Sequence, residues 1–252
     1  MKKLIINADD FGLTDGCNYG IIYAMKLGVV TSTSIMINMP KASDAIKLAK
    51  DNGIEGIGLH LTLTCGEPVS PKEEVPSLIN KRGYFYKRRA ELFPVMNLNE
   101  AEKELRNQIL EFKKYDIKLS HLDSHHHIHM YDGVREIVAN LAKEYNLPLR
   151  QPNLETKELL IELGVQTTDS FSMGFYDEKA NINELIDIID QIPDGSIEIM
   201  THPAIVDREL YDYSSYNKQR LDELKVLTSK ELKDWIEANN IKLITYGDLG
   251  TA

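Results

Sequence analysis

The sequence predicts an α/β protein built as a (β/α) barrel. Apolar runs of strand length alternate with helical patterns along the 252 residues. Within the run 57–63, leucine and isoleucine fall on one face, while Gly58, His60 and Thr62 fall on the other. Such a strand suits a parallel barrel with helices outside and polar groups inside. Polar clusters also follow the predicted strands, where barrels and open parallel sheets place their sites.

The first half of the chain alternates strands with helices up to a long loop. β-Branched and apolar runs predict the strands, and Gly28 and Gly53 follow the two helical patterns. The expected strands are 3–8, 29–39 and 57–63, and the expected helices are 15–28 and 42–50. Four prolines within residues 64–96 predict a loop insertion, either a lid or an elaboration, in a single domain that spans residues 1–252.

The second half continues the alternation with clear capping signals. Asn99 and Asn181 are each followed three residues later by a glutamate, a capping-box pattern ahead of an apolar helical face. A turn at 193–195 leads into a strand that ends at His202. The remaining expected strands start at 117, 147, 167 and 242, and the remaining expected helices are 133–145, 156–163 and 221–239.

Composition restricts the classes of partner. The formal charge of −10 argues against nucleic acid or an anionic membrane as the main partner, since both require basic patches. Two cysteines are too few for a disulfide framework. The apolar run after Lys3 is too short for a signal peptide, and no stretch reaches the length of a membrane span. We therefore expect a cytoplasmic protein.

Five of the seven histidines lie within residues 120–129, which predicts a metal site. Imidazole binds divalent cations and carries protons near neutral pH. A purification tag or a polar surface loop is the alternative, but this run is internal and follows a strand-like segment. The other two, His60 and His202, each end a short apolar run, where one histidine alone is more often a core residue.

Asp9 and Asp10 are the candidate carboxylates. One carboxylate and two imidazoles, with further positions open to water and substrate, make a hydrolytic metal site. On a regular strand the two adjacent aspartates would face opposite ways, so the residues alone do not decide which binds the cation and which takes a proton. A helix cap or a turn is the alternative role for this pair.

The strand expected from residue 117 would run through the histidine cluster. Period-two alternation predicts that one of its faces carries His121, Asp123, His125 and His127. Asp123 would then support a metal ligand or serve only in the strand. Since a cation rarely needs so many imidazoles, we expect lining or supporting roles for His121, His126, His127 and His129.

Taken together, these motifs resemble those of the YdjC-like carbohydrate deacetylases, a family that includes chitooligosaccharide deacetylase. The resemblance covers nearly the whole chain and rests on the blocks 7–12, 58–63, 121–129 and 201–203. It implies a distorted (β/α) barrel related to the polysaccharide deacetylases, one divalent metal ion, Mg²⁺ in this family, and a homodimer. Ligand chemistry alone would favour Zn²⁺ or another transition metal.

The resemblance also implies roles for individual residues. The metal ligands would be Asp10, His60 and His125. Asp9 would be the general base, and His202 the general acid that protonates the departing amine. Arg150 is similar to an arginine that orients the catalytic carboxylate in related deacetylases, with an ordinary surface charge as the alternative.

The expected function is metal-dependent removal of an N-acetyl group from a small acetylated carbohydrate, with release of acetate. Chitooligosaccharides are the expected substrates, and phosphorylated diacetylchitobiose is one candidate. Two alternatives stay open. A barrel-type metal phosphoesterase would usually hold more than one metal ion, and a non-catalytic sugar-binding protein would bind without turnover.

Overall fold

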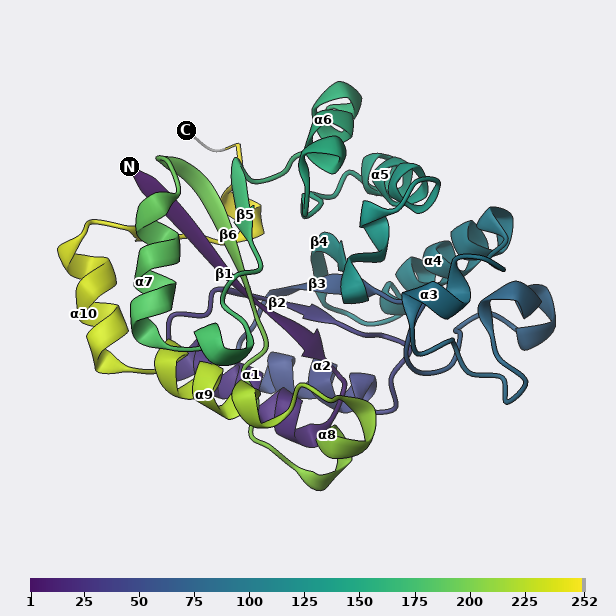
Figure 1. The fold of residues 1–252 in the computed structure, drawn as a ribbon, viewed down its shortest axis with the longest axis horizontal. Helices are drawn as coiled ribbons and strands as arrows, with labels where there is room; N and C mark the ends of the chain where they lie inside the picture. The colour runs from purple at the N-terminus through teal and green to yellow at the C-terminus, as the bar shows by residue number, and fades with distance from the viewer. Residues whose placement is uncertain (251–252) are drawn as a thin grey trace.

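The structure, a computed structural model, describes residues 1–250 and has a parallel sheet that curves among surrounding helices (Figure 1). Within this range the sheet has seven strands in the order β4-β3-β2-β1-β6-β5, with β7 paired to β1. β2 is shorter than the strand predicted at 29–39, and β5 starts three residues later than predicted. The strands are β1 Lys2–Phe11, β2 Ser32–Ile35, β3 Gly56–Leu61, β4 Lys118–Ser124, β5 Ser170–Ser172, β6 Gly195–Thr201 and β7 Lys242–Leu243.

Irregular hydrogen bonds extend from the edge strand β4 toward the segment that precedes β5, the other edge strand. The Leu122 N–H donates to the Pro148 carbonyl at 2.9 Å, and the Arg150 N–H donates to the Leu122 carbonyl at 3.0 Å. The Leu149 N–H in turn donates to the carbonyl of Gln166, shortly before β5, at 2.9 Å. The predicted barrel is therefore confirmed in a distorted form, while the expected strand from 147 is reduced to an isolated bridge.

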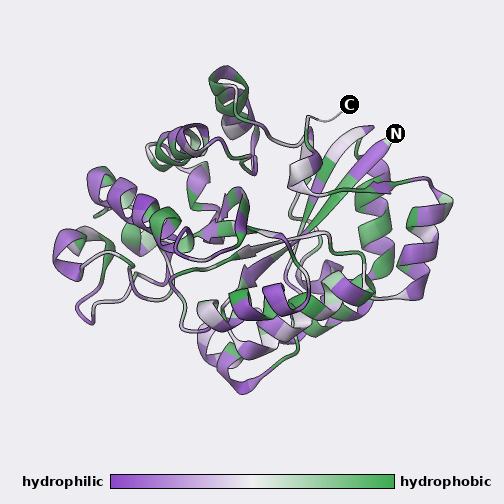
Figure 2. Ribbon diagram, turned by 180° about the vertical axis from the view of Figure 1, so that it is seen from behind, coloured by the Kyte–Doolittle hydropathy of each residue, from purple (hydrophilic) through white to green (hydrophobic). Residues whose placement is uncertain are grey.

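Helices cover the outside of the sheet and turn their apolar sides toward it. Figure 2 shows hydrophobic residues along the strands and on one side of the helices. Among the described residues, no helix combines the length and hydropathy needed to cross a membrane. The helices are α1 Asp15–Leu27, α2 Ala42–Asp51, α3 Arg89–Leu92, α4 Leu98–Phe112, α5 Val134–Tyr145, α6 Leu154–Leu163, α7 Ile182–Gln191, α8 Arg208–Tyr213, α9 Lys218–Leu227 and α10 Lys230–Ala238.

Two helical predictions are wrong in detail. The cap of α4 is Asn97, whose side chain accepts hydrogen bonds from the N–H groups of Asn99 and Glu100, so the predicted cap lies inside the helix. The helix expected at 221–239 is divided into α9 and α10, because the Ser229 side chain caps a new helix. The predicted cap at Asn181 is confirmed.

The segment 64–96 packs against the barrel. It contains 3-10 helices at Lys72–Glu74 and Pro76–Leu78, the short helix α3 and an antiparallel bridge between Ile79 and Phe85. Its apolar side chains belong to the main buried core, among them Val75, Leu78, Phe85 and Leu92. These contacts hold the segment beside the carboxyl ends of the strands, where the polar residues gather.

Candidate metal centre

The carboxyl ends of β1, β3, β4 and β6 surround a pocket of about 340 Å³. This volume lies at the lower end of the range for small-molecule sites. Side chains far apart in the sequence line the pocket, among them Asp9, Asp10, His60, His125, His202 and Arg220. Five of these six residues are ones that the sequence singles out.

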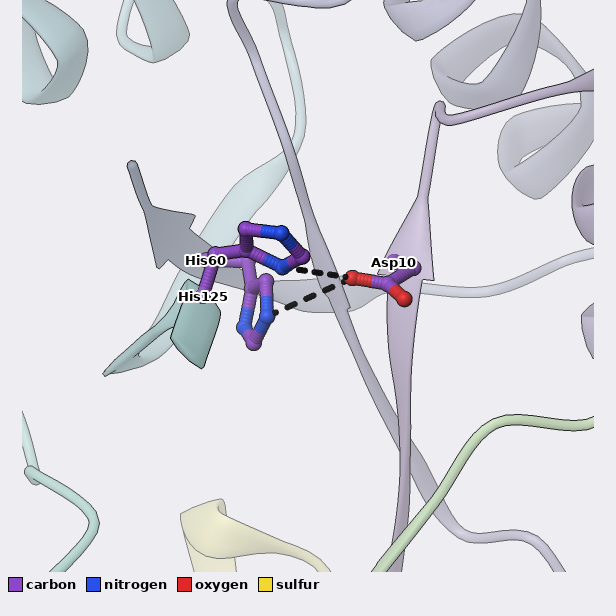
Figure 3. A group of neighbouring side chains, drawn as sticks. All are labelled: Asp10, His60 and His125. Atoms are coloured by element: carbon purple, nitrogen blue, oxygen red, sulfur yellow. Dashed lines mark hydrogen bonds and ion pairs between the residues drawn. The ribbon is translucent and has the colours of Figure 1, made fainter. Parts of the chain in front are cut away.

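Asp10, His60 and His125 come together at one point of this pocket (Figure 3). Asp10 Oδ1 lies 3.1 Å from His125 Nδ1 and 3.5 Å from His60 Nε2. One ligand atom from each residue lies within 4.8 Å of the others. A cation bound at about 2 Å from each of three ligands requires such spacing, so the donor set fits a divalent ion.

Asp9 and Asp10 reach the same pocket because β1 is irregular where they occur. Asp10 has a φ of 67°, in the left-handed region, and the pairing of β1 with β2 shifts register between Ala8 and Phe11. Asp9 Oδ2 therefore lies 3.9 Å from the same His60 nitrogen that Asp10 approaches. The prediction that the strand stops before Asp9 is wrong, since β1 continues to Phe11.

Asp123 contacts the His60 ring on the side that faces away from Asp10. The two residues pair in register between β3 and β4, and Asp123 Oδ1 lies 2.8 Å from His60 Nδ1. Because a carboxylate only accepts, Nδ1 donates and Nε2 faces Asp10. Burial lowers the pKa of His60, but the negative charges of Asp123 and Asp9 outweigh burial and raise this pKa to about 9. A cation at this point would take the place of that proton.

Arg150 holds Asp9 with two parallel hydrogen bonds. Its Nη1 and Nη2 each donate to one carboxylate oxygen of Asp9 at 2.7 Å, and its Nε donates to Glu198 at 2.9 Å. The side chain is completely buried, so the surface-charge alternative is wrong. Burial raises the pKa of Asp9, but Arg150 and His60 lower it more, so Asp9 stays ionised near neutral pH.

His202 follows β6 and lines the same pocket. Its backbone N–H donates to Glu223 on α9, and the other oxygen of Glu223 accepts from the Tyr216 hydroxyl. The His202 Nδ1 lies 3.8 Å from Glu223 and has no hydrogen-bond partner among residues 1–250. Tyr176 and Tyr216 contact the imidazole ring edge to face. These contacts fix the ring beside the pocket.

Comparison with known proteins agrees with the sequence motifs. The profile of the YdjC-like protein family matches residues 3–238. The chain belongs to the YdjC-like family. It is 44% identical to a carbohydrate deacetylase of Brevibacillus brevis, over 98% of this chain and 100% of the relative. It is 39% identical to a chitooligosaccharide deacetylase of Proteus mirabilis, over 98% of each chain.

A solved structure agrees with the fold of this YdjC-like chain. A crystal structure from Enterococcus faecalis V583, whose name refers to cleavage of cellobiose phosphate, superposes with a TM-score of 0.92. The two sequences are 38% identical, and the match covers 98% of each chain. The family predicted from the sequence blocks is therefore confirmed.

Arg220 is a site residue of the YdjC-like chain that sequence reasoning missed. Its Nη2 donates to Asp10 Oδ2 at 2.7 Å, and its Nε donates to the Tyr216 carbonyl at 2.8 Å. Burial raises the pKa of Asp10, but Arg220 and His125 bring it well below its usual range. Arg220 lies just outside the helix predicted at 221–239, and no motif around it marked it as functional.

The histidine cluster leaves the strand earlier than alternation predicts. β4 ends at Ser124, and His125–Met130 form a 3-10 turn in which His126 and His127 have positive φ angles. The expectation that His127 continues the strand face is therefore wrong. His127 still lines the pocket, and its Nδ1 has no hydrogen-bond partner within residues 1–250.

The remaining histidines of the cluster have structural partners. His121 stacks on Tyr246 with ring centroids 3.8 Å apart. His126 Nδ1 lies 2.9 Å from the Thr64 hydroxyl. His129 contacts the Ser124 hydroxyl and, through Nε2, the Arg150 carbonyl at 3.1 Å. Asp123 contacts His60 on the neighbouring strand, so it supports one of the expected ligands.

Proposed function

We propose that this protein is a metal-dependent hydrolase that removes the N-acetyl group from a small acetylated carbohydrate and releases acetate. The observation that carries the proposal is the presence, in one pocket, of a three-residue metal cluster and the arginine-held carboxylate of Asp9. Relatives that match nearly the whole chain are named carbohydrate deacetylase and chitooligosaccharide deacetylase. A chitooligosaccharide is the proposed substrate, and a phosphorylated diacetylchitobiose is one candidate.

The proposed metal ligands are Asp10, His60 and His125. When bound, the cation supplies positive charge that polarises the acetamide carbonyl and makes water at the site more acidic. His60 and His125 approach one oxygen of Asp10 from two directions, which leaves room for substrate on the open side of the pocket. We propose Mg²⁺ as the native ion from family resemblance, although two imidazoles also suit Zn²⁺.

Asp9 and His202 carry out the two proton transfers. Asp9 takes a proton from the attacking water as the new C–O bond forms, and Arg150 keeps the Asp9 carboxylate ionised and oriented. His202 gives a proton to the amide nitrogen as the C–N bond breaks, so that the sugar leaves as a neutral amine. The backbone contact with Glu223 holds His202 in place for this step.

The geometry supports one ion rather than two. Asp9, His60 and Asp123 form a second group with ligand-like spacing. However, Arg150 donates to Asp9 and lies 3.0 Å from Asp123, so a cationic side chain already balances these carboxylates. A two-metal phosphoesterase would need that second position. The pocket therefore favours the deacetylase over the phosphoesterase.

The test is an acetate-release screen on protein stripped by a chelator and reloaded with Mg²⁺, Mn²⁺, Co²⁺ or Zn²⁺. The substrates are N-acetylglucosamine, diacetylchitobiose and its phosphorylated form. We expect acetate from at least one sugar, with one metal ion per chain, and no acetate after chelation. Release of phosphate without acetate would identify a phosphoesterase, and saturable sugar binding without turnover would identify a binding protein.

We also propose that the protein works in the cytoplasm as a homodimer, on the basis of its sequence and its family resemblance. Cell fractionation tests the location of the protein. Light scattering on the purified chain tests the oligomeric state, and a monomeric mass at working concentration would contradict the dimer.

A further inference from the structure

Two residues of helix α9 contact two residues that line the pocket, Asp10 and His202. Arg220 donates to the Asp10 carboxylate, while Glu223 accepts from the His202 backbone and the Tyr216 hydroxyl. Positions three residues apart lie on the same face of a helix, so one turn of α9 makes both contacts. Both side chains are buried, with 3% of Arg220 and 0% of Glu223 exposed.

We propose that Arg220 is a positioning residue of the metal centre, which holds Asp10 so that one chosen oxygen faces the two imidazoles. The inference rests on the proposed function and adds a residue to it. Arg220 bonds to Oδ2 of Asp10, whereas Oδ1 is the oxygen that approaches His60 and His125. The arginine thus assigns separate roles to the two oxygens of one carboxylate.

Asp10 needs such a contact because its backbone is unusual. A residue with a side chain rarely adopts a φ of 67°, and such conformations persist only where surrounding contacts maintain them. Arg220 is itself fixed, since its Nε donates to the Tyr216 carbonyl and its own carbonyl accepts from the Ala204 N–H at 3.1 Å. It can therefore act as a rigid support for Asp10.

Positioning and charge predict opposite effects on metal affinity. The positive charge of Arg220 repels a cation, so its removal would tighten metal binding if charge alone mattered. The contact with Asp10 favours a cation, so its removal would weaken binding if orientation mattered more. Metal affinity therefore separates the two roles without any measurement of activity.

The experiment is calorimetric titration of Mg²⁺ and, separately, Zn²⁺ into the chelator-stripped full chain. We expect Arg220→Gln to weaken binding about 10–100-fold, the usual effect of removing a group that supports a metal ligand. Arg220→Lys keeps the charge but loses the planar fork, and we expect an intermediate affinity. The matched control is Arg106→Gln, because Arg106 pairs with Glu102 and Glu144 on the surface.

Tighter binding by Arg220→Gln, or native affinity in either Arg220 variant, would overturn the inference. If Arg220→Gln does not fold, the comparison of Arg220→Lys with the native chain decides the question. If an Arg220 variant loses activity and regains it at saturating metal, this result would add support, because added metal would not restore the activity of a variant with a merely structural defect. If the native chain binds none of Mg²⁺, Mn²⁺, Co²⁺ and Zn²⁺, the proposed function fails, which is a different result from equal binding by native and variant chains.

Discussion

Each of the two adjacent aspartates, Asp9 and Asp10, is paired with its own buried arginine. Arg150 takes both oxygens of Asp9, whereas Arg220 takes one oxygen of Asp10. The first contact keeps the carboxylate of the proposed base ionised and oriented, and the second leaves Oδ1 of Asp10 facing the two imidazoles. Removal of one partner from a buried ion pair typically costs about 3–5 kcal/mol, because the other charge stays buried and unpaired.

Replacement of the proposed base tests this division of roles. We expect Asp9→Asn to lower kcat/KM for acetate release by about 10²–10⁴-fold, the usual contribution of a general base. Metal should still bind, because Asp9 is outside the ligand group of Asp10, His60 and His125. Asp15→Asn is the control, since Asp15 pairs with Lys41 at the start of α1. Full activity in Asp9→Asn would rule out the proposed base.

Irregular backbone at the ends of strands shapes the site. The break in the pairing of β1 with β2 turns Asp9 and Asp10 toward one pocket. The 3-10 turn after β4 places His125 beside Asp10 instead of extending the strand. Both irregular segments make hydrogen bonds with residues far away in the sequence, as Asp10 does with Arg220 and His125. The local sequence alone therefore does not set their geometry.

The cap of α4 provides a test of the element boundaries. Asn97 accepts two backbone hydrogen bonds, whereas Asn99, the residue predicted as the cap, lies within the first turn. We expect Asn97→Ala to lower the free energy of unfolding by about 1 kcal/mol, because two helix N–H groups lose their acceptor. We expect Asn99→Ala to change it by less than about 0.5 kcal/mol. Urea denaturation of both variants measures the difference, and equal effects would contradict the assignment.

The barrel as a whole assembles the site from distant parts of the chain. The hydrogen bond between Asp10 and Arg220 joins residues 210 positions apart, and that between Asp9 and Arg150 joins residues 141 positions apart. Asp10, His60 and His125 lie together only when strands β1, β3 and β4 are in register. Metal binding and global stability should therefore be linked.

Removal of the metal should lower thermal stability. A ligand at 100 times its Kd stabilises the folded state by about 2.7 kcal/mol. For a chain of this size we expect a rise in Tm of about 5–10 °C on adding the ion. Scanning calorimetry with and without chelator measures the shift. The variant His125→Ala should show almost no shift, and an unchanged shift in that variant would place the ion elsewhere.

Stability should also fall in mild acid because His121 is buried as a neutral ring. Burial lowers its pKa from 6.5 to about 4, which outweighs the opposing effect of Asp123. Between these values the unfolded chain binds more protons, so this contribution is complete above pH 6.5 and is lost as the pH falls toward 4. At pH 5 the loss from this one group is about 2 kcal/mol.

The variant His121→Phe keeps a ring against Tyr246 but cannot titrate. We expect a shallower fall in unfolding free energy between pH 6.5 and pH 4.5 than in the native chain. Some slope should remain, since burial also lowers the pKa of His129 to about 3. Urea denaturation across this pH range measures both slopes. Identical slopes in the native and variant chains would contradict the assignment.

Several features could be predicted from the residues without any structure. The alternation of strands and helices depends on periodicity, and the expectation of a metal site depends on side-chain chemistry; both are properties of short segments. The choice of Asp10, His60 and His125 as ligands came from the family resemblance, and the structure brings these three side chains together. The role proposed for Arg150, orientation of the catalytic carboxylate, also came from the family resemblance. In the structure the Arg150 side chain donates to Asp9.

Other features depended on the folded chain. That Asp9 and Asp10 share a pocket follows from a break in strand pairing, and the contact of Arg220 with Asp10 follows from the packing of α9 against the barrel. Neither has a local pattern, because each depends on backbone geometry and on neighbours far away in the sequence. Side-chain chemistry identifies which groups can act, but only the packed backbone sets their directions and their partners.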